Sequence, residues 1–164
     1  MSNRPRFTFY LISLFILIDW ITKFAIMLHK EDVLTNYPIL YQYSWGKFFL
    51  CIAPTFNEGA AFGLFAQYKA FLFIIRVAII IFLLSYLFFK KNISPTLRLA
   101  FILLCAGAIG NLGDMIFYKH VIDFISIGYK HWVFPTFNLA DIFISLGTLI
   151  FVGKLYFPSK QKIK

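Results

Sequence analysis

Carboxylates and amides occur inside otherwise apolar stretches of this sequence, where they need a physical explanation. Asn111 precedes Asp114 by three residues, and Asn138 precedes Asp141 by the same spacing. Asp123 lies between the two pairs. Two carboxylates held close together cannot both ionise easily, so one keeps a proton while the other stays charged. Such a pair can take a proton from water and polarise a carbonyl, which indicates aspartic-protease chemistry without a metal or cofactor.

Some of these polar residues also have a purely structural interpretation. Asp19 and Lys23 are four residues apart, in the order that favours an ion pair on one helix face, so internal neutralisation is favoured over chemistry there. Asn111 alone is compatible with a hydrogen bond between helices, and the nearby pair Ala106 and Gly110 is typical of close helix packing. Asp141, an unpaired carboxylate in an apolar segment, favours the functional interpretation because a charge inside a membrane costs about 3 kcal/mol.

Other catalytic chemistries find no support in the sequence. His29, His120 and His131 do not have the spacing of metal ligands. The motifs of serine hydrolases, dithiol redox proteins and phosphate-binding loops do not occur. Cys51 and Cys105 are too few for a disulfide framework. We therefore expect no metal and no cofactor.

The elements that carry these residues are predicted to lie in a membrane. Hydrophobic residues make up 60% of the 164 residues and charged residues 14%, against roughly 25% in a soluble domain. The mean hydropathy is +0.77. A domain of this size still exposes about a third of its unfolded area, so it could not hide this much apolar surface from water. A soluble enzyme, a disordered tail and a secreted disulfide scaffold are all disfavoured.

Four apolar stretches approach the roughly 20 residues that a membrane helix needs. They cover residues 7–28, 70–89, 97–118 and 137–157. The sequence therefore predicts an all-α membrane protein, formed as one domain over residues 1–164. A small extracytoplasmic, partly β segment is expected between the first two helices, where residues 41–52 are aromatic and β-branched.

The basic residues indicate an orientation in the membrane rather than a nucleic-acid partner, although the net charge is +9. They concentrate at the two ends of the chain and in the short turn at residues 90–96. The positive-inside rule then places both termini in the cytoplasm and the two longer connections outside. In this orientation Asp114 and Asp141 each lie about 6 Å from the outer end of a helix. The polar residues therefore converge near the outer face.

Five segments resemble the motifs of the lipoprotein signal peptidase (signal peptidase II) family, in the family's order. Residues 19–23 (DWITK) resemble D-x-x-[ST]-K, and residues 57–63 (NEGAAFG) resemble N-x-G-A-A-F. Residues 107–114 (GAIGNLGD) resemble G-[AG]-x-G-N-x-x-D, and residues 121–125 (VIDFI) resemble V-V-D-F. Residues 134–141 (FPTFNLAD) resemble F-P-x-F-N-x-A-D. Each segment is weak evidence alone, whereas five in order are specific.

This resemblance implies an aspartic endopeptidase of the bacterial inner membrane, with its active site towards the extracytoplasmic face. It implies cleavage of diacylglyceryl-modified prolipoproteins before the lipidated cysteine. Carried over by position, Asp123 and Asp141 are the catalytic pair. The residues expected to support them or to bind substrate are Asp19, Lys23, Asn57, Gly59, Asn111, Asp114 and Asn138. Membrane lipids are the other expected partners, nucleic acid is not, and a monomer is expected.

One position departs from the family pattern, and two rival functions remain. Met115 stands where the family usually has an arginine, which leaves the neutralisation of Asp114 open, with Lys119 or Arg76 as candidates. A small proton-coupled carrier would line a polar path with similar residues, although here they crowd one side of the membrane. A membrane assembly protein would use them only to join helices.

Overall fold

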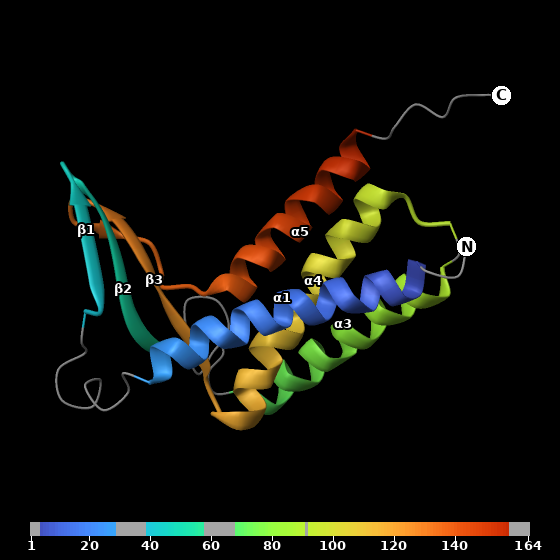
Figure 1. Cartoon of the computed structure of the whole chain (residues 1–164), viewed down its shortest axis with the longest axis horizontal. Coiled ribbons are helices and arrows are strands. Elements are labelled where there is room, and N and C mark those ends of the chain that lie inside the picture. The colour runs from blue at the N-terminus through green and yellow to red at the C-terminus, as the bar shows by residue number, and fades with distance from the viewer. Residues whose placement is uncertain (1–3, 29–38, 58–67, 91, 158–164) are drawn as a thin grey trace.

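The computed structural model describes residues 4–28, 39–57, 68–90 and 92–157. Four long helices and a small antiparallel sheet make up these segments (Figure 1). The helices are α1 (Arg4–Met27), α3 (Lys69–Phe89), α4 (Pro95–Phe117) and α5 (Leu139–Tyr156). The strands are β1 (Tyr41–Trp45), β2 (Phe48–Asn57), β3 (Val121–Tyr129) and β4 (Trp132–Val133).

The four predicted membrane helices are confirmed, with ends that differ by at most three residues. All four are long and apolar enough to cross a bilayer, so the chain is a multi-pass membrane protein. Local capping explains two of the shifted ends. Ser94 accepts a hydrogen bond from the Leu97 amide at 3.3 Å, and Pro95 stands in the first turn, so α4 begins earlier than predicted. Asn138 caps α5, which therefore begins at Leu139.

Helix α4 is the centre of the bundle and packs against the other three helices. About 56% of its apolar window is buried, whereas α3 and α5 bury 17% and 11% of theirs. The outer helices therefore present apolar side chains to the surroundings, as expected where lipid is the solvent. The core between α1, α3 and α4 contains Ile12, Leu83, Leu87, Ile102 and Cys105.

Small residues on α4 allow its neighbours to approach closely, as the Ala106–Gly110 pair predicted. A side chain on Gly107 would collide with the Ala140 carbonyl of α5. A Cβ on Gly110 would lie 2.6 Å from the Asp19 carboxylate of α1. The glycines are thus what brings the polar residues of α1, α4 and α5 within hydrogen-bonding distance of one another.

The sheet is larger than predicted. Strand was expected only in residues 41–52, where β1 and β2 occur, but β3 and β4 add the second long connection in the order β1-β2-β3-β4. The β2–β3 register places Asn57 opposite Val121 and Thr55 opposite Asp123, with an irregularity between Ile52 and Thr55. Asp123, which the sequence left in a connection between helices, is therefore held on a strand by the pairing of β3 with β2.

The sheet stands at one end of the bundle, where α1 and α4 end and α3 and α5 begin (Figure 1). Helix α1 begins and α5 ends at the opposite end. Polar residues near the sheet end of the helices therefore lie next to β3 and the end of β2.

Candidate active site

Asp123 and Asp141 come from different elements and line the same cavity of about 520 Å³. Asp123 lies on β3, and Asp141 is the third residue of α5. Asn57 and Asn111 also line this cavity. The structure therefore brings together the two carboxylates that the family resemblance assigns to catalysis.

Asn138 links the two carboxylates through its amide. Its Nδ2 donates to Asp123 Oδ1 at 2.7 Å and to Asn111 Oδ1 at 3.0 Å. Its Oδ1 accepts from the Asp141 backbone amide at 3.0 Å. Because Asn138 is fully buried, its amide cannot exchange these partners for water. It therefore fixes the positions of Asp123 and the start of α5 relative to each other.

Asp141 is held by the helix it begins. Its Oδ2 accepts from the Asn138 backbone amide at 3.2 Å, which completes a capping box at the N-terminus of α5. Its Oδ1 accepts from Asn111 Nδ2 at 2.8 Å. The N-terminal end of a helix favours negative charge, so this position suits an ionised carboxylate.

Asp123 has a different environment. It accepts hydrogen bonds from side-chain amides and is only 3% exposed. Asn57 Nδ2 donates to Asp123 Oδ2 at 3.1 Å from the end of β2. Burial raises the pKa of Asp123 from 3.8 to about 7, and the nearby Asp141 charge adds to that rise. Asp123 is therefore able to hold a proton near neutral pH.

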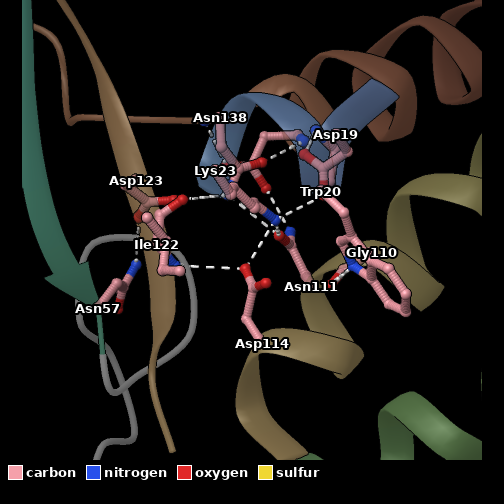
Figure 2. Close-up of polar contacts among 12 residues, drawn as sticks. Asp19, Trp20, Lys23, Asn57, Gly110, Asn111, Asp114, Ile122, Asp123 and Asn138 are labelled. Atoms are coloured by element: carbon pink, nitrogen blue, oxygen red, sulfur yellow. Dashed lines mark hydrogen bonds and ion pairs between the residues drawn. The ribbon is translucent and has the colours of Figure 1, made fainter. Parts of the chain in front are cut away.

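A group of charges that we call the Lys23 cluster lies next to Asn111: Asp19, Lys23 and Asp114 (Figure 2). Lys23 Nζ lies 2.7 Å from Asp19 Oδ2 and 2.7 Å from Asp114 Oδ2. It also donates to Asn111 Oδ1 at 2.9 Å, so all three of its donors are used. The predicted pairing of Asp19 with Lys23 is confirmed.

The Lys23 cluster also fixes parts of the site through hydrogen bonds. Asp19 Oδ1 accepts from the Ala140 amide at 2.9 Å, and Asp114 Oδ2 accepts from the Ile122 amide at 3.3 Å. Ala140 and Ile122 directly precede Asp141 and Asp123. The cluster therefore holds the backbone next to each of the two cavity carboxylates.

The hypothesis that Lys119 neutralises Asp114 is wrong. Lys119 Nζ donates to the Ile116 carbonyl at 3.2 Å, whereas Lys23 pairs with Asp114. Lys23 reaches from α1 to α4 and supplies the positive charge beside Asp114 that Met115 cannot supply. Arg76, the second candidate, lines the cavity with Asp123 and Asp141 instead.

The structure thus assembles all the predicted site residues that it describes, and Gly59 lies outside the described residues. Sequence reasoning did not place Arg76 in the site, although its charge within an apolar helix was a signal. Within the described segments, no group of three or more His, Cys, Asp or Glu side chains is arranged to hold a metal ion.

Comparison with known proteins decides between the functions still open. The sequence profile of signal peptidase (SPase) II matches residues 11–157, which is most of the chain. The chain belongs to the signal peptidase II family. This family membership excludes the small proton-coupled carrier and supports a protease over a non-catalytic assembly protein.

Individual relatives agree with the family assignment. The lipoprotein signal peptidase of Chlamydia abortus is 66% identical, and the alignment covers 100% of both chains. That of Chlamydia trachomatis serovar D is 46% identical over 99% of this chain and 98% of its own. A solved bacterial membrane enzyme is 28% identical, with a TM-score of 0.74, covering 96% of this chain and 92% of that one. A second such enzyme gives a TM-score of 0.69 at 27% identity and 93% coverage of both chains.

Proposed function

We propose that this member of the family is an intramembrane aspartic endopeptidase that removes signal peptides from diacylglyceryl-modified prolipoproteins. Cleavage occurs before the lipidated cysteine. The observation that carries the proposal is that Asp123 and Asp141 line one cavity and are joined through the amides of Asn111 and Asn138. Relatives along the full chain are named lipoprotein signal peptidases.

The two carboxylates have different roles in the proposed mechanism. Asp141 is the general base: it takes a proton from water, whose oxygen attacks the carbonyl carbon of the scissile bond. Asp123 is the general acid and gives its proton to the carbonyl oxygen, a role that its pKa of about 7 supports. When the tetrahedral intermediate collapses, Asp123 takes this proton back and Asp141 protonates the leaving amine.

Three side-chain amides position this reaction without adding charge. Asn111 holds Asp141, and Asn57 and Asn138 hold Asp123. A neutral donor orients a carboxylate and still leaves it able to gain and lose a proton. No metal or cofactor takes part in the proposed mechanism.

The mixed lining of the cavity supports a substrate that carries lipid. Asp123 and Asp141 share the cavity with apolar side chains that include Phe134, Ile142 and Leu146. A peptide held in a bilayer by acyl chains reaches such a cavity sideways, from lipid. The partners in this proposal are diacylglyceryl-prolipoproteins and membrane lipids, without nucleic acid, and the protein acts as a monomer.

The proposed location is the bacterial inner membrane, with residues 1–164 as one domain and both termini in the cytoplasm. The sheet and the cavity then face the extracytoplasmic side. Reporter proteins fused after Lys90 or at the C-terminus should report cytoplasm, and one inserted at the β3–β4 turn should report the outside. The reverse pattern would place the site on the wrong side for exported lipoproteins.

A cleavage assay tests the function directly. The purified chain in non-ionic detergent is given a diacylglyceryl-modified prolipoprotein or the same protein without lipid. We expect cleavage of the lipidated form alone, with a product whose N-terminus is the lipidated cysteine by mass spectrometry. Asp141→Asn should cleave about 10²–10⁴-fold more slowly. Folded protein that leaves the lipidated substrate intact, or cuts at another bond, would refute the proposal.

A further inference from the structure

Arg76 is a charged residue of α3 that has no role in the proposed mechanism. Beyond its first residue, α3 carries no other charged side chain, and its remaining residues are mostly large and apolar. A charge within a membrane helix is energetically costly, so it marks a site or a partner. Arg76 faces the cavity of Asp123 and Asp141 and is the one residue of α3 among its lining residues.

The position of Arg76 along the bundle separates it from the reacting carboxylates. Both α3 and α5 begin at the sheet end (Figure 1). Arg76 lies about 10 Å along α3, whereas Asp141 lies about 3 Å along α5. Ser145, which also lines the cavity, lies about 9 Å along α5. The cavity therefore continues past Asp141, away from the sheet, to a level where Arg76 and Ser145 supply polar groups.

We propose that Arg76 binds backbone carbonyl groups of the substrate peptide on the signal-peptide side of the scissile bond. This inference rests on the proposed function. A signal peptide whose cleavage site lies at Asp123 and Asp141 extends from there into the membrane, past the level of Arg76.

The chemistry of an unwound peptide in a membrane calls for such a donor. The peptide must leave helical conformation near the scissile bond so that water can attack, and its carbonyl groups then lose their helical partners. An unsatisfied backbone carbonyl in the hydrocarbon region is strongly unfavourable. A guanidinium has five N–H donors in a fixed fork, so Arg76 can serve the substrate and still attract Asp141. The acyl chains of the substrate need no donors and are better placed against the apolar wall.

Among the residues lining the cavity in the described chain, Arg76 is the sole cation. A single cation that shares the cavity with Asp141 and Ser145 provides strong directional binding without filling the cavity. A charge-assisted hydrogen bond lost from a buried site weakens binding about tenfold or more. Because the contact lies away from the reacting bond, its loss should change binding more than chemistry.

The first test compares Arg76→Met with Arg98→Met, the same change in α4. Arg98 donates to Thr8 at 3.1 Å and is absent from the cavity lining. The cleavage assay is run in non-ionic detergent without phospholipid. For Arg76→Met we expect KM to rise about tenfold with kcat within about twofold. Arg98→Met should leave KM unchanged, and Arg76→Lys should recover part of the loss.

The second test locates the contact on the substrate. Thioamide groups replace successive peptide carbonyls on the signal-peptide side, because sulfur is a weaker acceptor. One position should raise KM in the unaltered enzyme and have no further effect in Arg76→Met, as a double-mutant cycle requires for a direct contact. Additive effects at every position would overturn the inference.

Other outcomes also overturn it, each by a different route. A fall in kcat with a shifted pH profile would mean that Arg76 acts on Asp141. A fall in thermal stability with unchanged KM would make Arg76 structural. A KM effect that appears only when phospholipid is added would mean that Arg76 binds a lipid phosphate. If the unaltered protein does not cleave, the proposed function fails instead, so the two failures are distinguishable.

Discussion

The Lys23 cluster and the Asp123–Asp141 pair both contain buried aspartates, but their hydrogen-bond donors differ. An ammonium binds the carboxylates of the cluster, whereas amides bind those of the pair. In the cluster, one ammonium lies 2.7 Å from each of two carboxylates, and all three side chains are at most 3% exposed. In the pair, each carboxylate is bound by amide groups and borders a cavity.

The difference shows how one protein gives carboxylates separate tasks within a few residues. A buried carboxylate bound to an ammonium holds its neighbours in place, because charge-assisted hydrogen bonds are short and strong. A buried carboxylate bound by neutral amides is able to change its protonation state. The cluster therefore serves as the scaffold, and the pair beside the cavity serves as the reactive site.

The largest expected effect comes from removing either member of the pair. Asp123→Asn and Asp141→Asn should each lower the cleavage rate about 10²–10⁴-fold, and the double variant should be scarcely worse, because the two act as one unit. Cleavage rates are measured on protein with a normal elution profile and thermal midpoint. A folded single variant with near-normal cleavage would remove that residue from the proposed mechanism.

Removing the cation of the Lys23 cluster should lower the stability of the folded protein. Lys23→Met leaves Asp19 and Asp114 buried without a cation, which destabilises by about 3–5 kcal/mol and lowers the thermal midpoint in detergent by about 10 °C. Lys119→Met is the matched control and should change stability by about 0.5 kcal/mol or less, since Lys119 contacts one exposed carbonyl. Equal shifts in the two variants would show that the cluster is not the scaffold.

The pH dependence should distinguish the roles within the pair. Because the general acid Asp123 must be protonated and its pKa is raised to about 7, cleavage should decline as pH rises through about 7. Asn57 stabilises the charged form of Asp123, so Asn57→Ala should raise this pKa and move the decline upwards by roughly one pH unit.

Ser126→Ala is the control for this shift. Ser126 lies on the same strand and pairs with the Thr136 hydroxyl at 2.9 Å, so its removal should leave the pH profile unchanged. A decline that does not move in Asn57→Ala, or moves down, would contradict the assignment of the proton to Asp123.

The smallest effect is expected outside both regions. Cys51→Ala and Cys105→Ala should cleave within about twofold of the unaltered protein, and thiol reagents and chelators should not inhibit. Burial raises the pKa of the Cys51 thiol, which leaves little reactive thiolate, and Cys105 is fully buried in the core. Loss of activity on metal removal, restored by adding metal, would overturn the aspartic mechanism.

The sequence by itself determined the four membrane helices, the contacts within one helix and the motif segments. Apolar runs of about 20 residues must form helices in a bilayer, since only internal hydrogen bonds satisfy the backbone there. The Asp19–Lys23 pair was predictable because residues four apart share a helix face. The five motif segments named the candidate catalytic residues, since their order along the chain is a property of the sequence alone.

The tertiary structure decided which of these residues meet. Strand β3 exists through its pairing with β2, so nothing local required Asp123 to face Asn57. Lys23 reaches Asp114 because glycines on α4 let α1 approach, a fact that no pattern around Met115 could reveal. Arg76 faces the cavity because of how α3 is rotated against its neighbours. Contacts between distant segments depend on which faces pack together, and periodicity along one segment does not specify its partner.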